Sequence, residues 1–213
     1  SRNGSVTERA LPYILRYART SSNYGRDLNA PKIVRGNRVT SVPKTAQIDR
    51  TIAIEPSFNV FLQKGVDVVM RRRLSRVGLR LRDQTHNHGQ ARRGSIDGSL
   101  ATMDLSSASD TVSIELVRRL LPSDWFALLD DLRSHEYCDS SGVWHRYDKF
   151  SSMGNAFTFP LESLIFYTLA KVCMSYTHSD VSQLRVYGDD IIVPVEAYAL
   201  LSEVLTYAGF KVN

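Results

Sequence analysis

The sequence predicts an α+β fold, because it combines a tight hairpin of two strands with long amphipathic helices. Short runs rich in β-branched residues flank the tetrapeptide Tyr-Gly-Asp-Asp at 187–190, where glycine supplies the backbone freedom that a hairpin turn needs. Apolar side chains recur at helical spacing over residues 157–176. A further strand is predicted at residues 100–103, directly before Asp104.

The first hundred residues are predicted to mix helices and strands. In chain order we expect a short helix near 11–19, a hairpin over 33–40 with its turn at Gly36-Asn37, a strand at 51–54, a helix over 57–83 and a turn cluster at 94–99. The C-terminal part of this long predicted helix carries six arginines, and we interpret most of them as a solvated positive face: Arg71, Arg72, Arg73, Arg76, Arg80 and Arg82.

The remaining residues are predicted to be mainly helical. We expect a helix over 110–121 that ends at Pro122, a helix capped by Ser123, a hairpin over 137–147, a loop at 151–154 and the helix over 157–176. Pro160 fits that last helix only if it lies in the first turn.

Composition limits the class of protein. Of the 213 residues 43% are apolar, which supports a core, and no apolar run approaches the length of a membrane span. We expect no membrane association and no secretory signal peptide. The two cysteines, Cys138 and Cys173, lie far apart and indicate a reducing interior without a disulfide framework.

Charge is distributed unevenly along the chain. Residues 1–93 carry 19 Lys and Arg against 6 Asp and Glu, and residues 94–213 carry 8 against 16. Arginine accounts for 21 of the 27 basic residues, and its forked donors suit bidentate contact with phosphate. The first part could therefore attract phosphates while the second could collect metal ions.

The adjacent carboxylates Asp189 and Asp190 are the strongest chemical signal. Like charges held together at a hairpin tip repel each other unless a cation neutralises them, and a hard divalent ion such as Mg²⁺ prefers oxygen ligands. Asp104 ends another predicted strand, so its carboxylate converges with this pair if the strands are neighbours. Three carboxylates around two Mg²⁺ ions is the arrangement used in phosphoryl transfer. Upstream, Lys44 and Arg50 could hold a triphosphate.

Four segments in order resemble the motifs of viral RNA-directed RNA polymerases. Residues 104–110 resemble motif A, residues 151–158 motif B, residues 187–190 motif C, and residues 42–56 the basic fingers motif F. The amino-acid sequences of these segments, together with residues 59–65, are similar to those of the replicase catalytic subunit of single-stranded RNA bacteriophages, the leviviruses. This resemblance covers residues 33–213.

The resemblance implies a role for each matching residue. Asp104, Asp189 and Asp190 would be the catalytic residues and hold two Mg²⁺ ions, with Mn²⁺ as an alternative. Asp110 would recognise the ribose 2′-hydroxyl of the incoming nucleotide. The remaining nucleotide contacts would come from Lys44, Arg50, Ser152, Gly154 and Thr158. Glu162 stands where many viral polymerases have an asparagine that reads the ribose, so no ribose contact is assigned to it.

The resemblance also implies an α+β right-hand polymerase fold. Its palm would have an antiparallel sheet with an RRM-like core, and a fingers region would be present. Residues 1–100 would form a basic fingers-like region that is incomplete at its N-terminus. Residues 101–213 would form the palm, from which 122–150 reach the fingers. We expect the chain to be a fragment without the thumb, because it halts on entering a strand.

The implied activity is replication of a viral RNA in the cytoplasm of an infected bacterium. The implied partners are RNA template and product, ribonucleoside triphosphates, host translation elongation factors and a ribosomal protein. Two alternatives stay open: a reverse transcriptase, and a non-catalytic RNA-binding protein with a polymerase scaffold. The serines before Asp110 disfavour the first, because reverse transcriptases typically carry an aromatic gate there. His86 and His88 are interpreted as part of a polar loop rather than as metal ligands.

Overall fold

The computed structural model describes residues 4–20, 31–43 and 49–213, and it confirms a mixed α+β architecture. The chain forms two compact units, each made of two stretches of sequence. Unit 1 consists of residues 1–67 and 121–157, and unit 2 of residues 68–120 and 158–213. The long helix α2 (Ser57–Arg76) begins in unit 1 and ends in unit 2.

Unit 1 contains a four-stranded sheet in the order β4-β3-β7-β8. Its strands are β3 (Asn37–Pro43), β4 (Asp49–Ile54), β7 (Glu136–Cys138) and β8 (Trp144–Arg146). A parallel pair of short strands, β1 (Ser5–Thr7) and β2 (Lys32–Val34), and two helices, α1 (Leu11–Thr20) and α6 (Ser123–Leu132), complete the unit.

A buried polar network stabilises unit 1 around Glu55, whose side chain is 8% exposed. Its carboxylate accepts hydrogen bonds from Asn37 Nδ2 and Ser134 Oγ, both at 2.8 Å, and from Gln63 Nε2 at 3.3 Å. Since buried polar groups must be paired, this network ties β3, α2 and the segment after α6 together.

Unit 2 is built on the antiparallel sheet β5-β10-β9. It comprises β5 (Leu100–Met103), β9 (Arg185–Tyr187) and β10 (Asp190–Pro194). Two short strands, β6 (Leu105–Ser106) and β11 (Lys211–Val212), pair antiparallel with each other. Only Asp104 separates β5 from β6, so β11 continues the pairing beyond β5.

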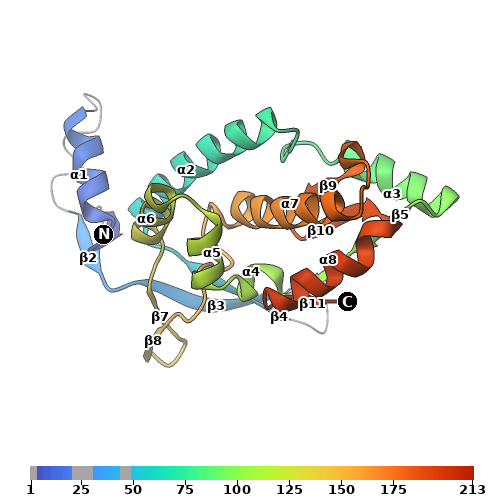
Figure 1. The fold of residues 1–213 in the computed structure, drawn as a ribbon. Coiled ribbons are helices and arrows are strands. Elements are labelled where there is room, and N and C mark those ends of the chain that lie inside the picture. Colours follow the sequence, from blue (N-terminus) through green and yellow to red (C-terminus); the bar gives the residue numbers. More distant parts are fainter. Residues whose placement is uncertain (1–3, 21–30, 44–48) are drawn as a thin grey trace. The chain divides into compact units, whose positions relative to one another are not determined.

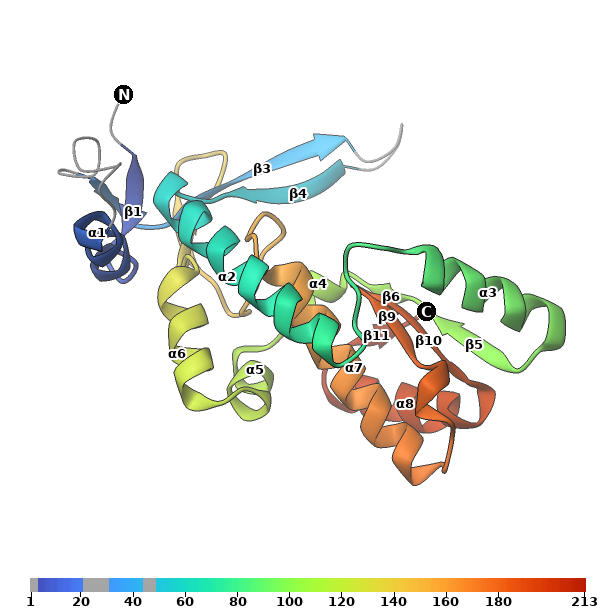
Figure 2. The ribbon, with the colours of Figure 1, turned by 90° about the horizontal axis from the view of Figure 1, so that it is seen from above.

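Helices cover both faces of this sheet. Helices α7 (Thr158–Tyr176) and α8 (Val195–Tyr207) pack against its strands, and Figures 1 and 2 show α3 (Thr85–Asp97) on the opposite side. The short elements α4 (Ala108–Thr111), α5 (Ile114–Leu120) and the 3₁₀ turn η1 (Val181–Gln183) lie between them in sequence. The apolar face predicted for residues 157–176 is buried as expected, for example at Leu161 and Ile165.

Local predictions fared unevenly. The hairpins at 137–147 and 184–194, the strand at 100–103 and Pro160 in the first turn of α7 are confirmed. The hairpin predicted over 33–40 is wrong, because β2 pairs with β1 whereas β3 pairs with β4 and β7. The helix predicted over 57–83 ends at Arg76, and the one predicted over 110–121 is divided into α4 and α5.

Two further predictions need correction. Residues 86–88 were expected in a loop but belong to the first turns of α3, which continues through most of the turn cluster predicted at 94–99. Helix α6 begins at Ser123, yet the residue at its N-cap is Pro122 and no side chain caps it. In both places polar residues suggested a loop or a helix cap, but their side chains do not determine where the helix begins and ends.

Candidate functional site

The hairpin β9–β10 holds the paired carboxylates of unit 2. Tyr187 pairs with Asp190, so Gly188 and Asp189 form the two-residue turn. Gly188 has a φ of +60°, and a Cβ atom there would lie 2.7 Å from a ring carbon of Phe159 on α7. Glycine is therefore required at this position by both the backbone conformation and the close packing of the turn on α7.

Ser163 of α7 anchors the same turn. The Gly188 N–H donates to Ser163 Oγ at 2.9 Å, and that hydroxyl donates in turn to the backbone oxygen of Phe159 at 2.8 Å. Ser163 is fully buried. The position of the two aspartates is thus fixed by a side chain that the sequence reasoning did not identify.

Asp104 lies at the neighbouring strand. Strands β5 and β10 pair with Met103 opposite Ile191, so the next position of this antiparallel register places Asp104 opposite Asp190. Desolvation raises the pKa of Asp190, and the negative charges of Asp189 and Asp104 raise it further. The structure therefore brings the three predicted catalytic carboxylates together.

The last residue of the chain also contacts Asp104. Asn213 Nδ2 donates to Asp104 Oδ2 at 2.8 Å, and the Asn213 N–H donates to the Asp104 backbone oxygen at 3.0 Å. Ser106 Oγ donates to Asn213 Oδ1 at 2.5 Å. These bonds orient the Asp104 side chain while, among the described residues, its Oδ1 atom has no hydrogen-bond donor.

Glu162 adds a further carboxyl group beside Asp189 and Asp110. Its side chain is 6% exposed. Desolvation raises the pKa of Glu162 to about 8, and the charges of Asp189 and Asp110 contribute to the shift. Glu162, for which the sequence had suggested no definite role, therefore lies near both Asp189 and Asp110, which is in the first turn of α4.

The donor chemistry of this carboxylate group suits a divalent cation. Carboxylate oxygens are the ligands that Mg²⁺ prefers. A bound Mg²⁺ would also neutralise the mutual repulsion that contributes to the raised pKa values of these groups. Within the described ranges, no three acidic, histidine or cysteine side chains already stand in coordinating positions. The carboxylates thus supply the ligands without a preformed cage. His88 of α3 lies close enough to Asp190 to oppose the rise in the pKa of that carboxyl group.

The other predicted nucleotide contacts are distributed over both units. Thr158 begins α7 in unit 2 and is buried, whereas Arg50, Ser152 and Gly154 belong to unit 1. Arg50 is exposed on β4, opposite Val42 of β3. Lys44 lies outside the described residues.

The motif B loop is attached to β4 within unit 1. The Ala53 N–H donates to the Met153 backbone oxygen at 2.6 Å. Gly154 has a φ of +119°, and a Cβ atom there would collide with the Ala53 backbone oxygen. In this structure, therefore, the absence of a side chain at Gly154 allows the backbone of β4 to pack closely against the motif B loop.

Glu162, Ser163 and Asn213 are the site residues that the sequence reasoning missed or left without a role. Two adjacent polar residues within the apolar, buried part of α7 were the available signal for the first two. None of the described helices is long and apolar enough to cross a membrane.

Comparison with known proteins agrees with the motifs. The model of the family "RNA replicase, beta-chain" matches residues 1–213. The RNA-directed RNA polymerase subunit beta of Qbeta virus strain MX1 is 46% identical over 207 residues, which are 97% of this chain and 35% of that protein. The corresponding beta chain of Escherichia phage MS2 is 44% identical over 98% of this chain and 37% of its own length.

The chain thus spans little more than a third of these curated relatives. A solved structure described as an "RdRp complex" aligns over 83% of this chain and 20% of its own, with a TM-score of 0.58 and 11% sequence identity, a likeness that concerns the fold alone. The family model and the phage relatives confirm the resemblance stated from the motifs: the chain belongs to the RNA replicase beta-chain family of RNA bacteriophages.

Proposed function

We propose that this chain carries the catalytic centre of an RNA-directed RNA polymerase that replicates a viral RNA by two-metal nucleotidyl transfer. The observation that carries the proposal is that Asp104, which follows β5, lies opposite Asp190 of the β9–β10 hairpin. The turn of that hairpin also carries Asp189. In a family of replicase beta chains, such a carboxylate group at the end of a sheet is best explained by phosphoryl transfer.

The reaction proposed is addition of a ribonucleotide to RNA. The 3′-hydroxyl oxygen of the growing strand forms a bond to the α-phosphorus, the bond to the pyrophosphate oxygen breaks, and the hydroxyl proton is released. Asp104 and Asp189 would hold two Mg²⁺ ions, or Mn²⁺ in their place, with Asp190 in support. Such ions, when bound, lower the pKa of the attacking hydroxyl and neutralise the leaving group.

Recognition of the nucleotide is proposed for the residues around this centre. Asp110 would accept a hydrogen bond from the ribose 2′-hydroxyl, and its proximity to Glu162, which also lies near Asp189, supports that placement. Lys44 and Arg50 would contact the triphosphate, with Ser152, Gly154 and Thr158 near the base-paired nucleotide.

In this proposal unit 2 is the core of the palm of a right-hand polymerase. The pairing of β11 with β6 beyond β5 gives the succession β11, β6–β5, β10, β9, which supports an RRM-like antiparallel palm. The fingers would be formed by the basic first part of the chain. Host elongation factors, a ribosomal protein and the cytoplasm of an infected bacterium remain proposals that follow from the family.

The test is RNA synthesis by the full-length protein on a defined template with Mg²⁺ and the four ribonucleotides. The Asp189→Asn variant should lose at least about a thousandfold in incorporation while binding RNA normally. Asp148→Asn, which changes an exposed carboxylate in unit 1, is the matched control and should retain activity.

The same assay separates the alternatives. Incorporation of deoxynucleotides in preference to ribonucleotides would favour a reverse transcriptase, and RNA binding without incorporation would favour a non-catalytic scaffold. Wild-type rates in Asp189→Asn would refute the metal assignment.

A further inference from the structure

The arginines at the end of α2 and in the segment that follows it form a surface that the proposed catalytic centre does not use. Arg72 is exposed on α2, and Arg80 and Arg82 are exposed on residues 77–84. The sequence alone suggested a solvated helix face. In the structure these side chains do not share one helix face, because α2 ends at Arg76 and the chain turns back.

A specific contact holds this turned-back segment. Arg71 Nη1 donates to the Leu81 backbone oxygen at 2.7 Å, and its guanidinium carbon lies 5.1 Å from the ring centre of Phe159. Leu79 and Leu81 are buried. Helix α2 and the segment thereby form the walls of a hollow of about 420 Å³, which four arginines line: Arg71, Arg72, Arg80 and Arg82.

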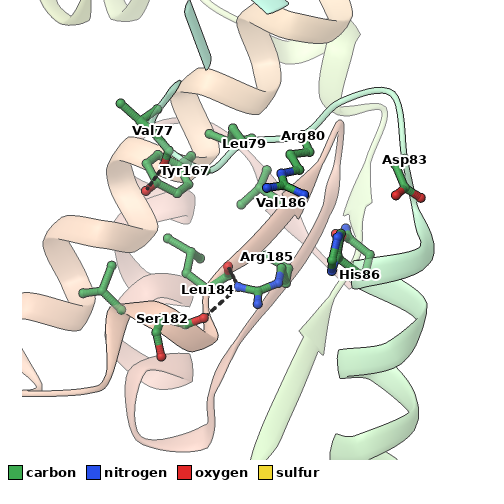
Figure 3. Close-up of a pocket in the computed structure, with 13 residues that line it drawn as sticks. Val77, Leu79, Arg80, Asp83, His86, Tyr167, Ser182, Leu184, Arg185 and Val186 are labelled. Atoms are coloured by element: carbon green, nitrogen blue, oxygen red, sulfur yellow. Dashed lines mark hydrogen bonds between the residues drawn. The ribbon is translucent and has the colours of Figure 1, made fainter. Parts of the chain in front are cut away.

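A second hollow of about 370 Å³ adjoins the first, and Arg80 and Asp83 line both. Figure 3 shows Arg80, Arg185 and His86 around one side of it, with Tyr167 and Leu184 on the other. Arg185 Nη1 donates to the backbone oxygens of Ser182 and Leu184, both at 2.7 Å, so its charged end is held in place. We call the two hollows together the arginine groove.

One unpaired donor also lines the arginine groove. Asn87 lines the second hollow, and its Nδ2 atom is buried without a hydrogen-bond acceptor among the described residues. A buried amide nitrogen without an acceptor destabilises the folded state. An anionic ligand would supply the missing acceptor.

The charges in the arginine groove are not balanced. Asp83 is the only acidic residue among the residues that line it, and Asp83 Oδ1 already accepts hydrogen bonds from the Thr85 N–H and hydroxyl at 2.9 and 2.7 Å. In the described parts of the chain, Arg72 and Arg82 have no carboxylate within ion-pair distance. Uncompensated guanidinium groups in a concave surface attract polyanions.

We propose that the arginine groove binds the phosphodiester backbone of single-stranded RNA, at a site separate from the catalytic carboxylates. Guanidinium forks match phosphate oxygens, and two adjoining hollows suit consecutive phosphates better than one isolated anion. Tyr167 and Leu184 offer an aromatic and an apolar wall for ribose or base, as single-strand binding sites do. The choice of RNA as the polyanion rests on the proposed function.

The experiment compares two triple variants of the full-length protein with the same change in charge. The groove variant is Arg72→Gln/Arg80→Gln/Arg82→Gln. The control is Arg93→Gln/Arg118→Gln/Arg119→Gln, whose arginines are also exposed in unit 2 but lie within ion-pair distance of Asp97 or Glu115. Affinity for a short single-stranded RNA is measured by fluorescence anisotropy at several salt concentrations.

We expect the groove variant to raise the Kd for RNA at least about tenfold at physiological salt. The slope of log K against log salt should fall by about 2, since each lost phosphate contact on a single strand is worth about 0.7. The control should change the Kd less than about twofold. The single variant Arg82→Gln, compared with Arg119→Gln, should show about a third of the slope change and serves if the triple variant does not fold.

Three results would overturn the proposal that the arginine groove binds RNA. Both triple variants could weaken RNA binding equally, or neither could weaken it. The groove variant could also lose binding of inorganic phosphate while its RNA binding is unchanged. These measurements need no nucleotide incorporation. If the wild-type protein incorporates nothing while the groove variant still loses RNA affinity selectively, the polymerase proposal fails and the groove stands.

Discussion

The backbone N–H of Gly188 donates a 2.9 Å hydrogen bond to Ser163 Oγ, and this bond joins the β9–β10 hairpin to helix α7. A short hairpin with two adjacent acidic side chains at its tip has little stability of its own. Its position is set from the helix side, by one buried hydroxyl and by the ring of Phe159. The positions of Asp189 and Asp190 therefore depend on the contact between the turn and α7.

Replacing Ser163 by alanine should loosen this contact. The Gly188 N–H would remain buried without an acceptor, at a cost of about 1–3 kcal/mol. We expect faster amide exchange for residues 184–194, by about 5- to 100-fold, and a lower incorporation rate. Hydrogen exchange followed by mass spectrometry measures the first effect. Ser175→Ala, at an exposed serine of α7, is the control, and equal exchange in both variants would contradict the anchoring role.

Gly188→Ala tests the packing of the turn against a control of similar backbone conformation. Gly142 also has a positive φ, +85°, but a Cβ atom there meets nothing within 4 Å. Both substitutions should cost about 1–2 kcal/mol of conformational strain. Only Gly188→Ala adds a collision with Phe159, for a further cost of about 1–3 kcal/mol. The difference between the two melting temperatures isolates that collision, and replacing Phe159 by leucine should restore part of it.

The buried carboxyl group of Glu55 should make stability depend on pH. Desolvation raises the pKa of Glu55 above its ordinary value of 4.5, against the opposing effect of the hydrogen bonds from Asn37, Ser134 and Gln63. The folded state therefore keeps a proton that the unfolded chain releases. The contribution of Glu55 to the free energy of unfolding is largest below the unfolded pKa and falls as the pH rises through the folded pKa.

Glu55→Gln should remove this dependence. The difference in melting temperature between the variant and the wild type should shift in favour of the variant as the pH rises from about 4 to about 8. Glu203→Gln, at an exposed position on α8, should give a difference that does not change with pH. A constant difference for Glu55→Gln as well would show that the carboxyl group has the same pKa in both states.

The elements that the sequence predicted well are those with a local cause. The hairpin at 184–194 follows from its turn glycine and β-branched runs, and α7 follows from its apolar spacing. The hairpin expected at 33–40 failed because Gly36 packs against the backbone of Glu136, about one hundred residues later in the chain, and no local pattern reports that contact.

The site shows the same division. Asp104, Asp189 and Asp190 could be named from the sequence because the carboxylates themselves are the chemical signal. The roles of Ser163 and Asn213 could not be predicted, since they arise only when α7 and β11 pack beside the carboxylates. The arginines at 71–82 were visible as charge, but their concave arrangement depends on the chain turning back after α2.

Asp110 is predicted to set the preference for ribonucleotides over deoxyribonucleotides. Its carboxylate lies near Glu162, as does that of Asp189, so a ribose would bind in this region if the α-phosphate is placed at the proposed catalytic carboxylates. A hydrogen bond to a charged acceptor contributes about 1.5–3 kcal/mol, so Asp110→Ala in the full-length protein should lower the ratio of kcat/KM for rNTP and dNTP by about 10- to 100-fold. Asp110→Asn retains an acceptor oxygen and should give an intermediate ratio, whereas Asp148→Asn should leave it unchanged. Single-nucleotide incorporation with each nucleotide measures the ratio, and an Asp110→Ala variant with wild-type selectivity would assign sugar recognition to another residue.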